Sequence, residues 1–103
     1  MSKIGVDIVE ISRMEKSIKN ERFLKKVFTE QEIEYCKSVQ SFAGIFAAKE
    51  AYFKALVTGI TYPITDVEVF HNENGKPYLN VNSTDLSISH DGNYAVAVVL
   101  IND

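Results

Sequence analysis

Two carboxylates and one lysine are the side chains of this sequence whose types could act together in chemistry. Asp7 lies in an early strand-like segment, while Glu50 and Lys54 stand four residues apart in a helical pattern and therefore share a helix face. Two carboxylates from separate elements can hold one hard cation, because Mg²⁺ takes one or two protein carboxylates together with water and substrate phosphates. With a lysine beside them, such a site suits phosphoryl transfer.

The same three residues also have an ordinary explanation. A Glu-to-Lys pair at this spacing is most often an exposed ion pair worth about 0.3–0.5 kcal/mol. An acid on the outward face of a strand is usually only solvated. The three residues alone therefore do not establish a site.

The composition indicates one compact domain over residues 1–103, because 46% of the residues are hydrophobic and 24% are charged. The longest apolar run, residues 95–101, is far shorter than the ~20 residues that span a bilayer, so no transmembrane helix is expected. The sequence shows no secretory signal pattern, which predicts a cytoplasmic location. A single cysteine fits a reducing compartment, and only two histidines are present, so no zinc site is expected.

The charge is distributed unevenly along the chain. Residues 1–54 hold ten of the eleven Lys and Arg residues with eight acids, whereas residues 55–103 hold one lysine with six acids. The cationic segment, residues 13–26, contains six Lys or Arg residues and two glutamates. The overall net charge of −3 argues against a dedicated nucleic-acid binder. A charged helical face is most often solvated surface, so the cationic segment alone does not identify a partner.

Hydrophobic periodicity divides the chain into a helical and a β-rich half. Residues 4–9 alternate as a strand, which predicts a buried face of Ile4, Val6 and Ile8 and places Asp7 on the other face. Residues 12–15 and 29–32 have the form of capping boxes that open short helices. Residues 41–57 form the longest helical pattern, which ends at Thr58-Gly59.

The second half follows the period of two that is typical of strands. Strands are predicted at 66–70, 78–81, 86–90 and 94–101, with hairpin turns at Asn74-Gly75 and Asp91-Gly92. Together these patterns predict an α+β fold. A long central helix and shorter N-terminal helices would pack on a small antiparallel sheet, which the first strand joins.

Several segments resemble, in the same order, those of the bacterial holo-[acyl-carrier-protein] synthases, the small 4'-phosphopantetheinyl transferases. These segments are GVDIVEI at 5–11, Phe28-Thr29 with Glu32, AGIFAAKEA at 43–51, Lys54-Ala55, TGI at 58–60, NGKP at 74–77 and SISH at 87–90. The combination of an early Gly-x-Asp-Ile-Val-Glu with a helical Phe-Ala-Ala-Lys-Glu-Ala is specific. The resemblance spans almost the whole chain.

The resemblance implies a reaction and roles for the three residues above. The phosphopantetheine arm of coenzyme A would move to a serine hydroxyl of an apo acyl carrier protein, releasing adenosine 3',5'-bisphosphate and supporting fatty acid biosynthesis. Asp7 and Glu50 match the acids that hold Mg²⁺, and Lys54 matches the lysine near the pyrophosphate. Either Glu50 or metal-polarised water could accept the serine proton, and the residues leave both open.

Further matches imply contacts to coenzyme A. His90 matches a histidine on the nucleotide side, and Lys76 and Pro77 match a turn near the nucleotide. Thr58 and Gly59 could bring backbone groups near the phosphates. Each feature has a structural alternative: a structural histidine, a hairpin turn or a helix cap.

Three positions depart from the family pattern. The family commonly has arginine where this chain has Ile45, so coenzyme A is expected to bind more weakly or through Lys49. Val57 stands where a glycine often precedes Thr-Gly, and Lys3 stands where another glycine is usual. His71 has no motif around it and is interpreted as a surface residue.

The resemblance also gives the cationic segment a partner, because acyl carrier proteins are acidic. Arg13 matches an arginine that meets the carrier, and Arg22 is the next candidate. A homotrimer with active sites at subunit interfaces is implied as well. Two rival functions are a non-enzymatic module that binds an acidic carrier, favoured by Ile45, and a metal-dependent phosphohydrolase, which has no sequence signal of its own.

Overall fold

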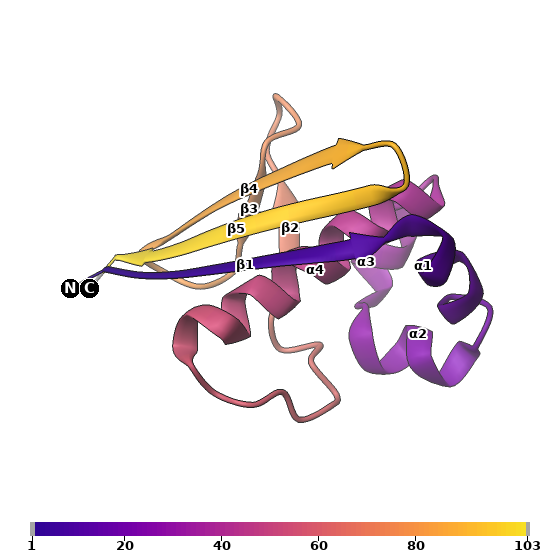
Figure 1. The fold of residues 1–103 in the computed structure, drawn as a ribbon, viewed down its shortest axis with the longest axis horizontal. Coiled ribbons are helices and arrows are strands. Elements are labelled where there is room, and N and C mark those ends of the chain that lie inside the picture. The colour runs from indigo at the N-terminus through magenta and orange to yellow at the C-terminus, as the bar shows by residue number, and fades with distance from the viewer. Residues whose placement is uncertain (1, 103) are drawn as a thin grey trace.

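A long helix lies across a twisted antiparallel sheet in the computed structural model, which describes residues 2–102 (Figure 1). The elements in chain order are β1 (Ser2–Glu10), α1 (Ile11–Ser17), α2 (Glu21–Val27), α3 (Glu30–Tyr35), α4 (Val39–Leu56), β2 (Val69–His71), β3 (Pro77–Leu79), β4 (Thr84–Asp91) and β5 (Tyr94–Asn102). The predicted α+β fold with its long central helix is confirmed.

The strands form two antiparallel sheets. The larger has the order β1-β5-β4, so the first and last strands are neighbours and the two chain ends lie together (Figure 1). β2 and β3 form a separate two-stranded sheet. The turn predicted at Asn74-Gly75 connects them, and Gly75 has a φ of +81°. The other turn is shifted by one residue from the prediction, because Asp91 pairs with Tyr94.

The buried face of β1 is the opposite of the predicted one. Ile4, Val6 and Ile8 are 69%, 55% and 62% exposed, whereas Gly5 and Val9 are buried. The alternation identifies two faces, but the close approach of α4 decides which one is covered.

Glycine at position 5 permits that approach. A Cβ at Gly5 would lie 2.0 Å from the Ala51 carbonyl oxygen and 2.6 Å from the Ala55 nitrogen, both in the α4 backbone. Because side chains alternate along a strand, Asp7 lies on the same face as Gly5 and is turned towards α4.

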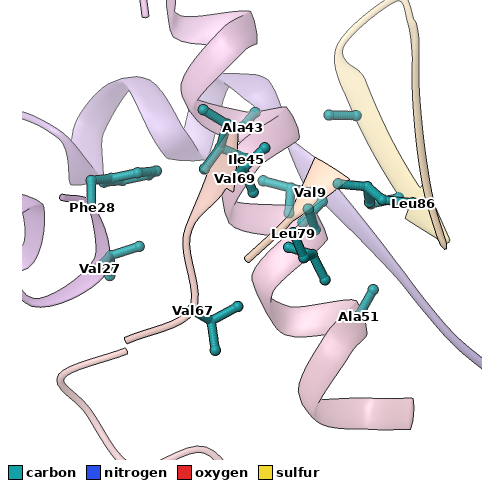
Figure 2. Packing of buried hydrophobic residues seen from close by; sticks show 14 of the residues in the cluster. Val9, Val27, Phe28, Ala43, Ile45, Ala51, Val67, Val69, Leu79 and Leu86 are labelled. Carbon is teal, nitrogen blue, oxygen red and sulfur yellow. The ribbon is translucent and has the colours of Figure 1, made fainter. Parts of the chain in front are cut away.

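Small side chains on α4 continue this close packing. Ala43, Ala47 and Ala51 are fully buried, as are Ala95 and Ala97 of β5. Larger apolar side chains fill the core around them, as Figure 2 shows. Those labelled there include Val9, Phe28, Ile45, Val69, Leu79 and Leu86.

Of the two predicted capping boxes, one forms and the other does not. Thr29 and Glu32 form the predicted box at the start of α3. The box predicted at residues 12–15 is wrong, because α1 already begins at Ile11. Asn93 of the β4–β5 turn caps α1 instead, by accepting bonds from the Ile11 and Ser12 nitrogens at 2.7 and 3.1 Å. At the end of α4, Val57 has a φ of +59°, a conformation that favours glycine.

Replacement of Gly5 by alanine tests the contact between β1 and α4. We expect Gly5→Ala to lower the free energy of unfolding by at least about 3 kcal/mol, because the new methyl group would overlap helix backbone. Gly59→Ala is the matched control, since a Cβ there meets nothing within 4 Å. Urea unfolding followed by circular dichroism measures both. Equal stability of the two variants would contradict the contact.

Candidate functional site

The packing of β1 against α4 brings Asp7, Glu50 and Lys54 together. The Lys54 ammonium donates a hydrogen bond to Asp7 Oδ1 at 2.9 Å. Asp7 and Glu50 both line a cleft of about 330 Å³ between β1, α1 and α4. The Asp7 side chain is only 14% exposed, whereas that of Lys54 is 56% exposed. The three predicted residues therefore form one cluster in space. We call the cleft that Asp7 and Glu50 line the acidic cleft.

Asp7 and Glu50 bring two carboxylates together beside the Lys54 ammonium, and Glu10 and Arg13 also line the acidic cleft. The pKa of Glu50 is raised, first by burial and then by the negative charge of Asp7, while Lys54 opposes the shift. The hydrogen bond to Asp7 is the main cause that raises the pKa of Lys54. Burial, followed by the nearby Glu50, raises the pKa of Tyr62 in the loop after α4. A cation would relieve the repulsion between the two acids.

This donor set fits a magnesium ion better than a metal that needs a full protein shell. Residues 2–102 contain no cluster of three or more His, Cys, Asp and Glu side chains that could hold a metal. Mg²⁺ requires fewer protein ligands, because water and substrate phosphates complete its coordination. Asp7 and Glu50 are the residues that could hold it.

Cationic and aromatic side chains border the acidic cleft. Arg13 lines it together with Phe23 and Phe46. Arg22 lies at a neighbouring hollow with Lys26 and Tyr62. The two arginines predicted to meet a partner therefore lie beside the acidic cleft.

Two of the residues predicted to bind coenzyme A meet at a second cavity. His90 and Pro77 line this cavity of about 220 Å³ together with Gly44 and Ile45. His90 Nε2 lies 3.2 Å from the Gln40 carbonyl oxygen. We call this space the histidine cavity.

The other predicted contacts lie elsewhere. The Lys76 ammonium donates to the Leu86 carbonyl oxygen at 3.2 Å, in a hollow with Asp85 and Val98. Thr58 and Gly59 are exposed in the segment that follows α4. Within one chain, these three residues do not join His90 and Pro77.

The prediction that Lys49 binds coenzyme A is wrong. Its side chain is fully buried, and its ammonium donates to the Val27 carbonyl oxygen and to Glu32 Oε1, both at 2.5 Å. Glu32 Oε2 also accepts a bond from the Val69 nitrogen at 2.7 Å. Lys49 follows Ile45 by four residues, and this position on the apolar stripe of the helix was the sequence signal for burial.

One residue at the histidine cavity was missed by the sequence interpretation. His71 is a partly buried residue that lines this cavity, and its ring stacks on that of Tyr35 with centroids 3.8 Å apart. The two residues are far apart in sequence and share no motif. No local pattern could have paired them.

Comparison with known proteins identifies the family. The profile of the 4'-phosphopantetheinyl transferase superfamily matches residues 3–99. A holo-[acyl-carrier-protein] synthase of Nautilia profundicola is 44% identical over 110 residues, covering 95% of this chain and 97% of that protein.

Solved structures agree with this match. A Bacillus anthracis holo-(acyl-carrier-protein) synthase in complex with CoA (3',5'-ADP) has a TM-score of 0.83 and 39% identity, covering 95% of this chain and 93% of that one. A Helicobacter pylori holo-[acyl-carrier-protein] synthase in complex with coenzyme A has a TM-score of 0.85 and 35% identity, covering 93% and 96%. The chain belongs to the 4'-phosphopantetheinyl transferase superfamily and, within it, to the holo-[acyl-carrier-protein] synthase family.

A variant pair tests the buried interaction of Lys49. We expect Lys49→Met to lower the free energy of unfolding by about 3–5 kcal/mol, because it leaves the Glu32 carboxylate buried without its cation. Adding Glu32→Gln removes the unpaired charge and should recover part of this loss. Urea unfolding of the single and double variants measures both values. A Lys49→Met cost below about 1 kcal/mol would contradict the pair.

Proposed function

We propose that this chain transfers the 4'-phosphopantetheine group of coenzyme A to a serine hydroxyl of an apo acyl carrier protein. The observation that carries the proposal is that Asp7 and Glu50 line one cleft, with Lys54 bonded to Asp7, in a chain that belongs to this family. Related proteins that bear the synthase name, and solved relatives in complex with coenzyme A, support it.

The reaction forms and breaks one bond to phosphorus. The serine oxygen bonds to the phosphorus that carries the pantetheine arm, and the bond from this phosphorus to the bridging pyrophosphate oxygen breaks. Adenosine 3',5'-bisphosphate leaves with the bridging oxygen and its electron pair. The serine proton passes to Glu50 or to water held in the acidic cleft.

Each residue of the acidic cleft has a role in this scheme. Asp7 and Glu50 would hold Mg²⁺, which supplies charge neutralisation for the pyrophosphate when bound. The ammonium of Lys54 lies beside Asp7 and is the more exposed of the two, so it can turn towards the leaving phosphate oxygen.

The cationic segment would receive the acidic carrier. Arg13 borders the acidic cleft itself and Arg22 the adjoining hollow, so a carrier bound there would present its serine near Glu50. Complementary charge raises mainly the association rate and is weakened by salt. Such binding suits an enzyme that must release a protein product.

We further propose a cytoplasmic homotrimer with active sites shared between subunits. The support within this chain is an apolar face of the larger sheet, opposite α4. On it, Ile4, Val6 and Ile8 of β1 pair in register with Leu100, Val98 and Val96 of β5. Exposed apolar patches of this kind commonly mark protein interfaces. No helix within residues 2–102 is long and apolar enough to cross a membrane.

The transfer assay tests the proposed reaction. The chain is incubated with coenzyme A, Mg²⁺ and an apo acyl carrier protein, and the carrier is weighed by mass spectrometry. We expect Asp7→Asn and Glu50→Gln each to slow transfer at least about a hundredfold, because each removes a carboxylate that would hold the Mg²⁺ that neutralises the pyrophosphate.

Asp66→Asn is the matched control, since Asp66 is an exposed acid between α4 and β2, outside both the cleft and the cationic segment. It should transfer at the wild-type rate. Wild-type protein that modifies none of several carriers would contradict the transferase and favour a binding module. Full activity of the Asp7 or Glu50 variant would remove that residue from the site.

A charge reversal tests the carrier surface. We expect Arg13→Glu to raise the KM for the carrier about tenfold, with little change in the KM for coenzyme A. The difference from wild type should shrink as salt rises. Lys37→Glu, the same change at an exposed residue outside the cationic segment, is the control. An Arg13→Glu effect confined to coenzyme A would contradict the assignment.

A further inference from the structure

The loop between α4 and β2, residues 57–68, brings Tyr62 to the border of the acidic cleft. Tyr62 lines the adjoining hollow with Arg22, and Phe23 lines both that hollow and the acidic cleft. The Tyr62 hydroxyl donates a hydrogen bond to the carboxylate of Glu50. Tyr62 therefore connects this hollow to one of the two acids of the cleft.

Two hydrogen bonds fix the loop that carries this tyrosine. The Ile64 nitrogen donates to the Lys26 carbonyl oxygen at 2.8 Å, and Ile64 is only 2% exposed. The next carbonyl oxygen along α2, that of Val27, accepts a bond from the buried ammonium of Lys49. Because Lys49 directly precedes Glu50 on α4, the loop is anchored to the helix beside Glu50 itself. The tyrosine is thus held in place before a ligand binds, which lowers the ordering cost of binding.

The two acids of the cleft have different partners. The Asp7 carboxylate accepts a hydrogen bond from the charged Lys54 at 2.9 Å. Glu50 is repelled by the negative charge of Asp7, and a glutamate side chain is flexible enough to turn away into solvent. A hydroxyl donor opposes this movement. Because the hydroxyl is neutral, it leaves the charge of Glu50 available to a cation or a proton.

We infer that Tyr62 is a positioning residue for the transfer reaction, whose hydroxyl holds the Glu50 carboxylate beside Asp7, where the two acids together receive a divalent cation. The inference rests on the proposed function and deepens it, since it assigns a role to a residue of the loop after α4. Tyr62 acts through Glu50 and not on the reacting atoms. It contributes orientation, whereas Glu50 contributes charge.

Titration with Mn²⁺, followed by electron paramagnetic resonance, tests the inference. Mn²⁺ prefers oxygen ligands, as Mg²⁺ does, and is visible to this method. Coenzyme A is present, so that its phosphates complete the coordination, and the carrier is left out. We expect Tyr62→Phe to weaken Mn²⁺ binding about tenfold, because it removes one hydrogen bond to a charged group.

The transfer assay gives a second readout of the same variant. At a Mg²⁺ concentration below saturation, Tyr62→Phe should transfer about tenfold more slowly than the wild type, and excess Mg²⁺ should restore much of the rate. The KM for the carrier should stay unchanged, because the residues of the cationic segment are intact.

A double variant shows whether Tyr62 acts through Glu50. In a Glu50→Ala background, Tyr62→Phe should change the Mn²⁺ affinity less than about twofold, because the carboxylate that it positions is gone. A merely structural effect of the tyrosine would persist in this background. The residual transfer rate carries the comparison if Glu50→Ala binds too little Mn²⁺ to measure.

Tyr78→Phe is the matched control. Tyr78 is 48% exposed, close to the 42% of Tyr62, but it lines neither the acidic cleft nor the adjoining hollow. Its variant should bind Mn²⁺ like the wild type. Urea unfolding of Tyr62→Phe should match the wild type as well, since the ring is kept and only the hydroxyl is lost.

The outcomes separate this inference from the proposed function. Tyr62→Phe that binds Mn²⁺ like the wild type, or that loses equal affinity with and without Glu50, would overturn the role of Tyr62, as would a wild type that binds no Mn²⁺. If the wild type still modifies the carrier in these cases, the proposed function stands. A wild type that binds Mn²⁺ in a Tyr62-dependent way but modifies no carrier would contradict the proposed function and support the positioning of Glu50.

Discussion

The contact between the backbones of β1 and α4 is the constraint on which the candidate site depends. Gly5 has no Cβ, and one placed there would lie 2.0 Å from the Ala51 carbonyl oxygen. Fully buried alanines on α4 extend the close approach along the helix. Asp7 is two residues further along the same strand face and is therefore pressed towards Glu50 and Lys54. Two carboxylates meet because two backbones can approach without side chains between them.

A buried ion pair fixes the other side of α4. Lys49 and Glu50 are adjacent in sequence but lie about 100° apart around the helix. Lys49 points inward to Glu32 and Val27, whereas Glu50 points to the acidic cleft. Removing a charge from such a pair leaves its partner buried and unpaired, so the helix has little freedom to rotate. The same Glu32 carboxylate also ties α3 to β2, the two elements that carry the stacked rings of Tyr35 and His71.

The sequence could predict what depends on local pattern and on motif. The capping box at Thr29, the long helix and the Asn74-Gly75 turn follow from spacing and residue type, and the structure confirms them. Asp7 and Glu50 were paired through the family resemblance, because neither residue alone indicated a site. Family membership is likewise confirmed by relatives that cover almost the whole chain.

Other features depend on contacts that no local pattern contains. The period of two in β1 defines two faces, but the small residues of α4 decide that the Gly5 face is covered. The charge of Lys49 suggested a surface role, whereas its partner lies seventeen residues away on another helix. The stack of Tyr35 on His71 forms only when α3 meets β2.

The packing of β1 on α4 places Asp7 close enough to Glu50 for the negative charge of Asp7 to raise the pKa of Glu50. The most direct measurement is the pKa of the Glu50 side chain by carboxyl ¹³C NMR titration, in the wild type and in Asp7→Asn. We predict a pKa above the ordinary glutamate value in the wild type and a lower pKa in the variant, because a neighbouring negative charge has been removed. An ordinary Glu50 pKa that does not respond to Asp7→Asn would contradict the account.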